Sequence, residues 1–238
     1  MNRLERAWRH FVDTPRSKAG KSLLYPLSFF LNVISRVRNK GYDLQFLPSY
    51  KPQDMVVISI GNLTVGGTGK TPMTILIANE LEKVGHGAIL TRGYRRQSTG
   101  AFHINQQNLH RYDPKITGDE PYLMAKSTQA TIIVNQNREL ALKKAEALGC
   151  RWALLDDGFQ RRQSARDLDI VLIGPKLFGN GLCFPAGPLR EPPSSLNRAD
   201  LIVMIEHSHT DNKPCIIPYA KSPIIKAKWA PQSLISYH

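Results

Sequence analysis

A glycine-rich loop carries the strongest chemical signal in the sequence. The segment SIGNLTVGGTGKTP, residues 59–72, begins in an apolar run typical of a buried strand and ends in an amphipathic helical pattern. In that setting glycines let backbone N–H groups turn inward and bind phosphate oxygens, and the positive end of the following helix adds to the attraction. Lys70 would reach the terminal phosphates of a nucleotide, and the Thr71 hydroxyl would bind Mg²⁺. We therefore predict a nucleotide-binding loop made of Thr64, Val65, Gly66, Gly67, Thr68, Gly69, Lys70 and Thr71.

The loop departs from the GxxxxGK[ST] pattern at its first position, where Thr64 stands in place of glycine. On the motif alone, a glycine-rich turn before a helix stays open as the alternative. A phosphate loop also predicts an acidic residue at the end of a second buried strand, where it holds Mg²⁺ directly or through water. The segment WALLDDG, residues 152–158, supplies Asp156 and Asp157 at that place. A strand that merely ends in an Asp-Gly turn is the alternative for this segment.

Further charged residues follow predicted strands or begin predicted helices. Asp119 and Glu120 precede a helical pattern that we expect to start at Tyr122. They are either an N-terminal cap with a favourable helix dipole, or a Mg²⁺ ligand and a base beside an acceptor hydroxyl. Arginines stand where loops follow strands and favour an anionic substrate, although each one alone is typical of a solvated surface: Arg92, Arg95, Arg96, Arg161, Arg162 and Arg190.

Short apolar runs that alternate with helical patterns position these residues. Continuous apolar runs suit strands buried on both faces, as in a doubly wound, mostly parallel α/β sheet. The expected strands are 55–61, 87–91, 131–134, 152–156, 168–174 and 200–206, and the expected helices are 71–84 and 138–148. Residues 97–115 are polar and predict a loop or small insertion, whereas 174–197 predict a long run of turns rich in proline and glycine.

Composition and charge exclude several classes of protein. Hydrophobic residues make up 42% of the 238 residues, which excludes a disordered chain, and three widely spaced cysteines exclude a disulfide scaffold or a zinc ribbon. The net charge of +13 indicates an anionic partner. Residues 1–51 contain ten Lys and Arg against three acidic residues, with apolar residues at helical spacing and no signal-peptide pattern. The apolar stretch 23–37 is too short to span a bilayer and predicts an interfacial helix, with packing on the core as the alternative.

Taken together, the motifs resemble the tetraacyldisaccharide 4′-kinase family, the lipid A 4′-kinases of Gram-negative bacteria. The matching blocks occur in the family's order: GNLTVGGTGKTP (61–72), TRGYRR (91–96), GDEP (118–121), LLDDGFQRR (154–162), LDIVLIG (168–174), FGNGLCFPAGPLREP (178–192) and LNRADLIV (196–203). The family's loop also has threonine at its first position, so the departure at Thr64 supports the resemblance.

The resemblance implies transfer of the γ-phosphate of ATP to the 4′-hydroxyl of a tetraacylated disaccharide 1-phosphate, giving lipid IVA, with ATP and Mg²⁺ as cofactors. It implies that Lys70 binds phosphates and that Thr71, Glu120 and Asp156 surround Mg²⁺. It makes Asp119 the base and Asp157 a supporting catalytic residue, and it directs Arg92, Arg95 and Arg190 toward substrate phosphates.

The resemblance also sets the expected organisation of the chain. We predict a basic helical segment over 1–51 that associates with the membrane, a kinase core over 52–210, and a tail over 211–238 that is truncated relative to the family. Family members continue into a smaller C-terminal region with an Asp-His motif, which this sequence lacks. The expected location is the cytoplasmic face of the inner membrane, bound peripherally to an anionic surface and without nucleic acid.

Two other classes stay open from the residues. One is a P-loop switch ATPase of the partition or cofactor-insertion type, whose loop usually has lysine where this chain has Val65. The other is a nucleic-acid-binding module, which only the positive charge suggests, because the basic helices lack the aromatic platforms of single-strand binders.

Overall fold

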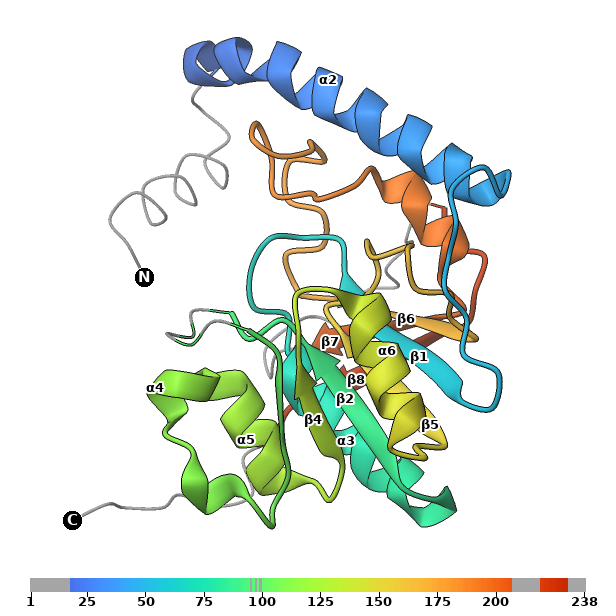
Figure 1. Ribbon diagram of the computed structural model, residues 1–238. Coiled ribbons are helices and arrows are strands. Elements are labelled where there is room, and N and C mark those ends of the chain that lie inside the picture. The colour runs from blue at the N-terminus through green and yellow to red at the C-terminus, as the bar shows by residue number, and fades with distance from the viewer. Residues whose placement is uncertain (1–17, 95, 97, 99, 207–218, 231–238) are drawn as a thin grey trace, which may run out of the picture.

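The computed structural model describes residues 18–94, 96, 98, 100–206 and 219–230. Its centre is an eight-stranded sheet in the order β3-β4-β2-β5-β1-β6-β7-β8 (Figure 1). All neighbouring strands are parallel except the β3–β4 pair. The strands are β1 (Val56–Asn62), β2 (Gly87–Thr91), β3 (Phe102–Ile104), β4 (Thr131–Val134), β5 (Trp152–Asp156), β6 (Leu168–Ile173), β7 (Leu201–Glu206) and β8 (Ile224–Lys228).

The central strands form because their residues are apolar on both faces, as a sheet covered on both sides requires. Every residue of β2, β4 and β5 is buried. All six strands expected from the apolar runs are present, each within one residue of its predicted ends. The predicted doubly wound, mostly parallel α/β fold is therefore confirmed.

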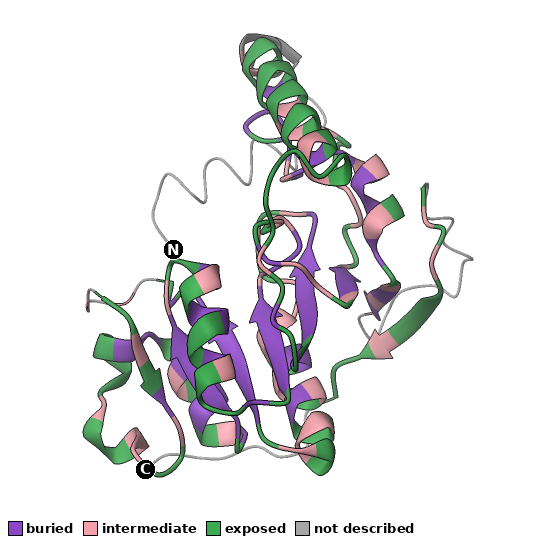
Figure 2. Cartoon of the chain, turned by 45° about the vertical axis from the view of Figure 1, so that its right-hand side comes forward, coloured by how far each residue is buried: buried purple, intermediate pink, exposed green. Residues whose placement is uncertain are grey.

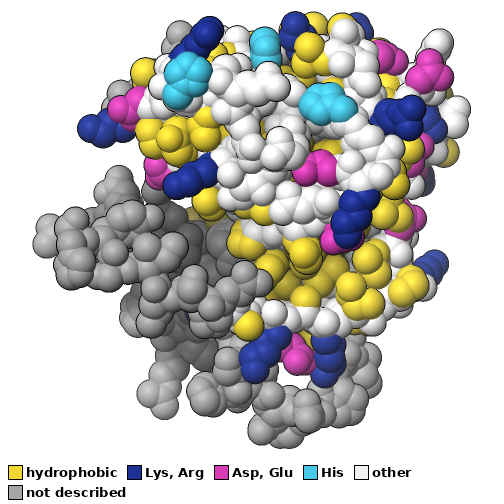
Figure 3. All heavy atoms as spheres, turned by 90° about the horizontal axis from the view of Figure 1, so that it is seen from below, with side chains coloured by type: hydrophobic (Ala, Val, Ile, Leu, Met, Phe, Trp, Pro, Cys, Tyr) yellow, Lys and Arg dark blue, Asp and Glu magenta, His cyan; other side chains and the backbone are white. Residues whose placement is uncertain are grey.

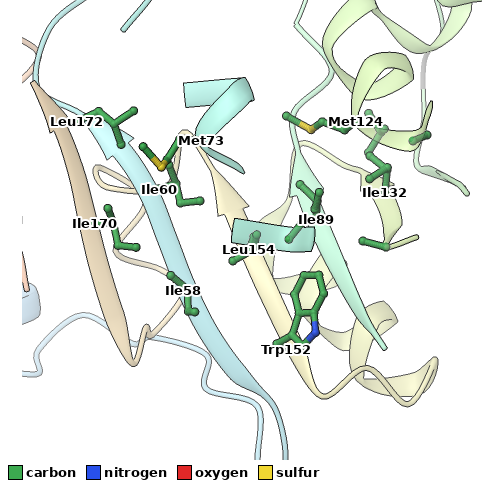
Figure 4. Close-up of a cluster of buried hydrophobic side chains, with 14 of the residues drawn as sticks. Ile58, Ile60, Met73, Ile89, Met124, Ile132, Trp152, Leu154, Ile170 and Leu172 are labelled. Carbon is green, nitrogen blue, oxygen red and sulfur yellow. The ribbon is translucent and has the colours of Figure 1, made fainter. Parts of the chain in front are cut away.

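Helices cover one face of the sheet and a mixture of helix and turns covers the other (Figure 1). On the first face, α3 (Lys70–Leu81) and α5 (Asp119–Ser127) pack over a cluster that includes Ile60, Ile89 and Leu154 (Figure 4). On the second face, α6 (Arg138–Ala147) covers Ala88, Leu90 and neighbouring side chains. Beside α6, the segment between β6 and β7, with the 3₁₀ helix η3 (Pro193–Arg198), covers Val171, Ile173 and Ile202.

Three elements differ from the expectation. Helix α5 begins at Asp119 instead of the expected Tyr122, so both acidic residues lie in its first turn. The expected loop 97–115 contains β3, the 3₁₀ helix η2 (Leu109–Arg111) and the start of the short helix α4 (Pro114–Thr117). Within the expected C-terminal tail, β8 pairs with β7 and extends the sheet by one strand. A further 3₁₀ turn, η1 (Glu82–Val84), continues α3.

The division of the chain into the segments 1–51, 52–210 and 211–238 stays a prediction.

A long N-terminal helix, α2 (Lys18–Asp43), lies apart from the sheet and above the segment between β6 and β7 (Figure 1). Most of its described surface is exposed, in contrast to the buried strands (Figure 2). Seen from below, the surface also has an area in which hydrophobic side chains gather, with charged side chains above and below it in the view (Figure 3). No described helix is long and apolar enough to cross a membrane.

Candidate functional site

The predicted phosphate loop connects the end of β1 at Asn62 to the start of α3 at Lys70. Gly66 and Gly69 have positive φ angles of 130° and 78°, which residues with a Cβ atom rarely adopt. The loop is held from the side by residues 188–190. The N–H of Val65 donates to the carbonyl of Pro188 at 2.7 Å, and the N–H of Arg190 donates to the carbonyl of Leu63 at 2.7 Å. This pairing brings Arg190, which lies far along the chain, to the side of the loop.

Lys70 lies at the centre of a polar group beside the loop. Its Nζ is 3.4 Å from Oδ1 of Asp157 and donates a hydrogen bond of 3.3 Å to Oδ1 of Asn62. The Asn62 amide in turn donates to the Thr68 hydroxyl at 2.9 Å. Asn62 is fully buried and connects the lysine to the loop, which the sequence patterns did not reveal. The arrangement holds the ammonium group close to the loop's backbone N–H groups.

Asp157 is paired with two cations. Besides Lys70, Nη1 of Arg190 donates to both carboxylate oxygens of Asp157, at 2.8 and 2.7 Å. Burial raises the pKa of Asp157, but the charges of Lys70 and Arg190 lower it more, so the pKa lies below its usual range. The backbone of Asp157 has a φ angle of 56°. This left-handed turn redirects the chain directly after β5, which gives Asp156 and Asp157 different surroundings.

Asp156 lies at the buried end of β5, with 5% of its surface exposed. Its Oδ2 accepts a hydrogen bond from the Thr91 hydroxyl at 3.2 Å, whereas Oδ1 has no hydrogen-bond partner among the described residues. Burial, together with the charges of Glu120 and Asp157, raises the pKa of Asp156 to about 6, although Lys70 and Arg138 oppose the shift. A bound cation would remove the cost of keeping this buried carboxylate ionised.

The three predicted oxygen ligands for Mg²⁺ belong to three different elements. Asp156 comes from β5, Glu120 from the first turn of α5, and the Thr71 hydroxyl from the first turn of α3. Within the described part of the chain, no three His, Cys, Asp or Glu side chains are grouped closely enough to hold a metal by themselves. Mg²⁺ keeps several waters and is usually bound through one or two carboxylates and the substrate's phosphates, so this donor set fits it. The unpartnered Oδ1 of Asp156 is the atom that supports the fit.

The remaining predicted residues are placed as follows. Asp119 is exposed beside Glu120 in the first turn of α5. Arg92 is exposed immediately after β2, and Arg95 lies outside the described residues. The predicted set Lys70, Asp156, Asp157 and Arg190 is brought together at the carboxyl ends of β1 and β5, the place where α/β sheets bind ligands.

Arg138 is a buried residue of this region that the sequence patterns missed. Its guanidinium donates to the backbone carbonyls of Asp156, at 3.1 Å, and Asn135, at 3.0 Å. Burial lowers the pKa of Arg138 to about 10, and the nearby charges of Arg161 and Arg92 act in the same direction. Its place at the start of a helix, just after β4, was the only signal in the sequence. Arg138 thus fixes the backbone of Asp156 from the second face of the sheet.

Glu191 connects the site to α2. The carboxylate is 1% exposed and accepts hydrogen bonds from Arg38 of α2 at 2.9 Å and from Arg198 of η3 at 2.7 Å. Between α2 and residues 183–191 lies a pocket of about 260 Å³ whose wall includes Arg38, Arg190 and Glu191. One side of this pocket is therefore formed by the arginine that binds Asp157, and the other by the exposed helix.

Comparisons with known proteins agree on one family. The model of the family described as tetraacyldisaccharide-1-P 4′-kinase matches residues 20–237. The tetraacyldisaccharide 4′-kinase of Coxiella burnetii is 38% identical over 195 residues, which are 81% of this chain and 58% of that protein. The enzyme of the same name from Histophilus somni is 38% identical over 184 residues, 76% of this chain and 54% of that protein. The chain spans little more than half the length of these curated relatives.

A solved structure shares the fold. The crystal structure of LpxK from Aquifex aeolicus in complex with ATP has a TM-score of 0.74 and 35% sequence identity to this chain. The similarity covers 87% of this chain and 64% of that one.

Proposed function

Because this chain belongs to the tetraacyldisaccharide-1-P 4′-kinase family, we propose that it transfers the γ-phosphate of ATP to the 4′-hydroxyl of a tetraacylated disaccharide 1-phosphate, giving lipid IVA. The observation that carries the proposal is the group formed by Lys70, Asp157 and Arg190 beside the glycine-rich loop. Phosphoryl transfer needs little covalent chemistry from a protein, and positioned charge supplies most of the catalysis. This group supplies such charge next to a phosphate-binding backbone.

Each side chain has a defined task in this proposal. The backbone N–H groups of residues 66–71 bind the phosphates, and Lys70 neutralises charge on the transferred group. Asp157 holds Lys70 and Arg190 in place through its two ion pairs. Asp119, an exposed carboxylate at the start of α5, accepts the proton of the incoming hydroxyl.

Mg²⁺ would be held by Asp156, Glu120 and Thr71, and when bound it would neutralise charge between the terminal phosphates. Arg138 contributes by fixing the backbone of Asp156, so that the unpartnered Oδ1 keeps its direction. Thr91 holds the other oxygen of the same carboxylate.

The pocket between α2 and residues 183–191 is the proposed place for part of the acceptor. Arg190 lines this pocket and also binds Asp157, so an acceptor in the pocket lies next to the catalytic charges. Arg92 and Arg95 remain proposed contacts for phosphates of the substrate. The acyl chains would stay in the membrane, on which α2 rests.

The structure of α2 supports contact with an apolar phase, because its polarity is inverted relative to a helix packed on a core. Its polar residues Ser28 and Asn39 are buried, and the Ser28 hydroxyl accepts a hydrogen bond from the N–H of Ala186 at 2.8 Å. Large apolar residues are exposed instead: Leu27, Phe29, Phe30, Leu31, Val33, Ile34 and Val37. We therefore propose peripheral attachment to the cytoplasmic face of the inner membrane.

A kinase assay tests the proposed function. The protein is incubated with Mg²⁺, γ-labelled ATP and a tetraacyldisaccharide 1-phosphate in detergent, and the transferred label is measured in the lipid. We expect labelled lipid from the wild type and at least a thousandfold less from Lys70→Ala, which lacks the cation at the transferred phosphate. Equal labelling by the two proteins would contradict the assigned loop. ATP binding without lipid labelling by the wild type would restrict the chain to nucleotide binding.

A further inference from the structure

Trp229 lies against the phosphate loop although it follows β8, the last strand of the sheet. A Cβ atom added to Gly69 would be 2.5 Å from the indole Nε1 of Trp229 and 3.0 Å from its Cε2. The indole therefore occupies the space that a side chain at position 69 would need. About a third of Trp229, 37%, remains exposed, which is a large apolar surface to leave in water beside a polar loop.

We infer that Trp229 is the stacking platform for the base of the bound nucleotide. This inference rests on the proposed function, because it assumes that the loop binds nucleotide phosphates. Neither the sequence patterns nor the site described above assigns a residue to the base.

The register of β8 explains why Trp229 faces the loop. Ala227 pairs with Ile205, and both pack against the cluster on the face of the sheet covered by α3. Side chains alternate between the faces of a strand, so an extended backbone places residue 229 on the same face as Ala227. In a parallel pair, the residue after β8 also lies at the same edge of the sheet as the ends of its neighbours. Trp229 consequently points toward the start of α3, where Gly69 lies.

The direction of the nucleotide follows from the charges on the other side of the loop. Asp156 is the last residue of β5 and Asp157 follows it, while Glu120 belongs to α5, which packs against β4. The proposed function places the transferred phosphate among these groups, because the proposed base, Asp119, lies beside Glu120. The nucleoside must then extend the opposite way, toward β6, β7 and β8. Trp229 is the aromatic residue that the structure places on this side in contact with the loop.

The chemistry of an indole predicts a particular specificity. Stacking on an aromatic face favours any base, because every base has a π surface, whereas discrimination between bases depends on hydrogen bonds to their edges. Trp229 should therefore increase the affinity for ATP and GTP alike and leave the affinity for inorganic tripolyphosphate unchanged. Removal of an aromatic–base contact is expected to weaken nucleotide binding about tenfold.

The experiment compares binding of Mg·ATP, Mg·GTP and Mg·tripolyphosphate by calorimetry. We expect Trp229→Ala to raise the Kd for both nucleotides about tenfold and to leave the Kd for tripolyphosphate within twofold. Trp229→Phe should recover most of the affinity, because it keeps an aromatic face. Ile224→Ala is the matched control: this residue lies on the same strand, is 41% exposed and points to the opposite face. Circular dichroism establishes that each variant is folded.

A second readout uses the tryptophan itself. Trp152 is 2% exposed and lies at the start of β5, far from the loop, and Trp8 lies outside the described residues. In a Trp8→Phe background, ATP should therefore quench the emission of Trp229, and tripolyphosphate should not.

Other outcomes would overturn the inference. If Trp229→Ala weakened the binding of nucleotides and of tripolyphosphate equally, the indole would only support the loop. If it changed the affinity for neither, the base would bind elsewhere. If the wild type bound tripolyphosphate but not ATP, the assignment of Trp229 to the base would be wrong, whereas the assignment of the phosphate loop would hold. Loss of binding for all three ligands would instead contradict the proposed function.

Discussion

Two adjacent carboxylates of this site, Asp156 and Asp157, have pKa values shifted in opposite directions. Asp156 is buried beneath the sheet edge, where burial raises its pKa to about 6. Asp157 turns out of β5 with a positive φ angle and pairs with Lys70 and Arg190, which lower its pKa despite its burial. Because a metal favours the ionised form of a ligand, Asp156 suits cation binding, whereas Asp157 already has its cations within the protein.

The roles proposed for Asp156 and Asp119 can be separated by their dependence on Mg²⁺. We expect Asp156→Asn to raise the Mg²⁺ concentration needed for half-maximal activity at least tenfold, because one ligand loses its charge. Asp119→Ala should lower kcat about a hundredfold or more at every Mg²⁺ concentration, because the base is lost. Kinase assays over a Mg²⁺ titration measure both effects. Identical Mg²⁺ profiles for the two variants would show that the residues do not have separate roles.

At the scale of elements, Glu191 joins α2, η3 and the segment that holds the phosphate loop. Its carboxylate is almost fully buried between Arg38 and Arg198, and the preceding residue, Arg190, pairs with Asp157. The guanidinium carbon of Arg198 also lies 4.6 Å from the centre of the ring of Phe159, which comes two residues after Asp157 in the chain. The position of α2 is therefore linked to the position of the group formed by Lys70, Asp157 and Arg190.

Removing the charge of Glu191 should weaken the contact that holds α2 and η3 together. We expect Glu191→Gln to reduce the free energy of unfolding by about 3 kcal/mol, because the nearby guanidinium groups lose a buried anionic partner. It should also raise KM for the lipid more than KM for ATP. Urea unfolding and steady-state kinetics measure the two effects. Glu139→Gln is the matched control, since the Glu139–Lys143 pair is about half exposed on both sides and should change stability by less than about 0.5 kcal/mol.

Asp167 binds the backbone at the start of β1, and its lowered pKa leads us to expect that stability depends on pH. Burial raises the pKa of Asp167, but the N–H of Val57 at 2.9 Å and Lys51 at 3.0 Å lower it more, so it lies below its usual value. A lowered pKa in the folded state stabilises the protein above the unfolded pKa of about 4, and the contribution is lost as the pH falls through the folded value.

We therefore expect Asp167→Asn to lower the free energy of unfolding by about 1 kcal/mol at pH 7, a modest amount because the pair is partly exposed. The difference from the wild type should shrink below about pH 4. Urea unfolding at pH 7, 5 and 3.5 measures it, with Asp54→Asn, an exposed position, as the control. A difference that stayed constant over this range would show that the charge of Asp167 is unimportant.

At the scale of the whole molecule, α2 presents an apolar surface away from the sheet. Phe29 and Phe30 are 71% and 62% exposed, and Arg36 and Lys40 are exposed on the same helix. Arg38, in contrast, is engaged by Glu191. The helix is fastened to the core by buried polar residues, so its apolar side chains are free to contact lipid.

This arrangement predicts peripheral membrane binding that depends on both apolar and charged contacts. The protein should sediment with anionic vesicles, less at high salt and less with neutral vesicles, since each basic residue near an anionic surface contributes on the order of 1 kcal/mol. The double variant Phe29→Ser with Phe30→Ser should lose at least tenfold in vesicle affinity. Leu140→Ser, at an exposed apolar position on α6, is the control and should bind as the wild type does. Equal binding to neutral and anionic vesicles, or unchanged binding of the double variant, would contradict the prediction.

Features that depend on local patterns were predictable from the amino-acid sequence. Strands such as β2, β4 and β5 were predictable because parallel strands buried on both faces require continuous apolar runs. The glycine-rich loop between β1 and α3 and the carboxylates at the end of β5 were predictable because glycine spacing and strand ends are properties of short segments. The edge strands β3 and β8 were missed, since a short or exposed strand needs no such run: four of the five residues of β8 are exposed.

Contacts between residues far apart in the chain, in contrast, depend on the tertiary fold. Arg190 reaches Asp157, Arg38 reaches Glu191, and Trp229 reaches Gly69, across 33, 153 and 160 (229 − 69) positions of the chain. Such contacts depend on the order of the strands and on the side of the sheet to which each loop returns, which no local pattern encodes. The same holds for the polarity of α2, because a helical pattern shows that an apolar side exists but not whether that side faces the protein or its surroundings.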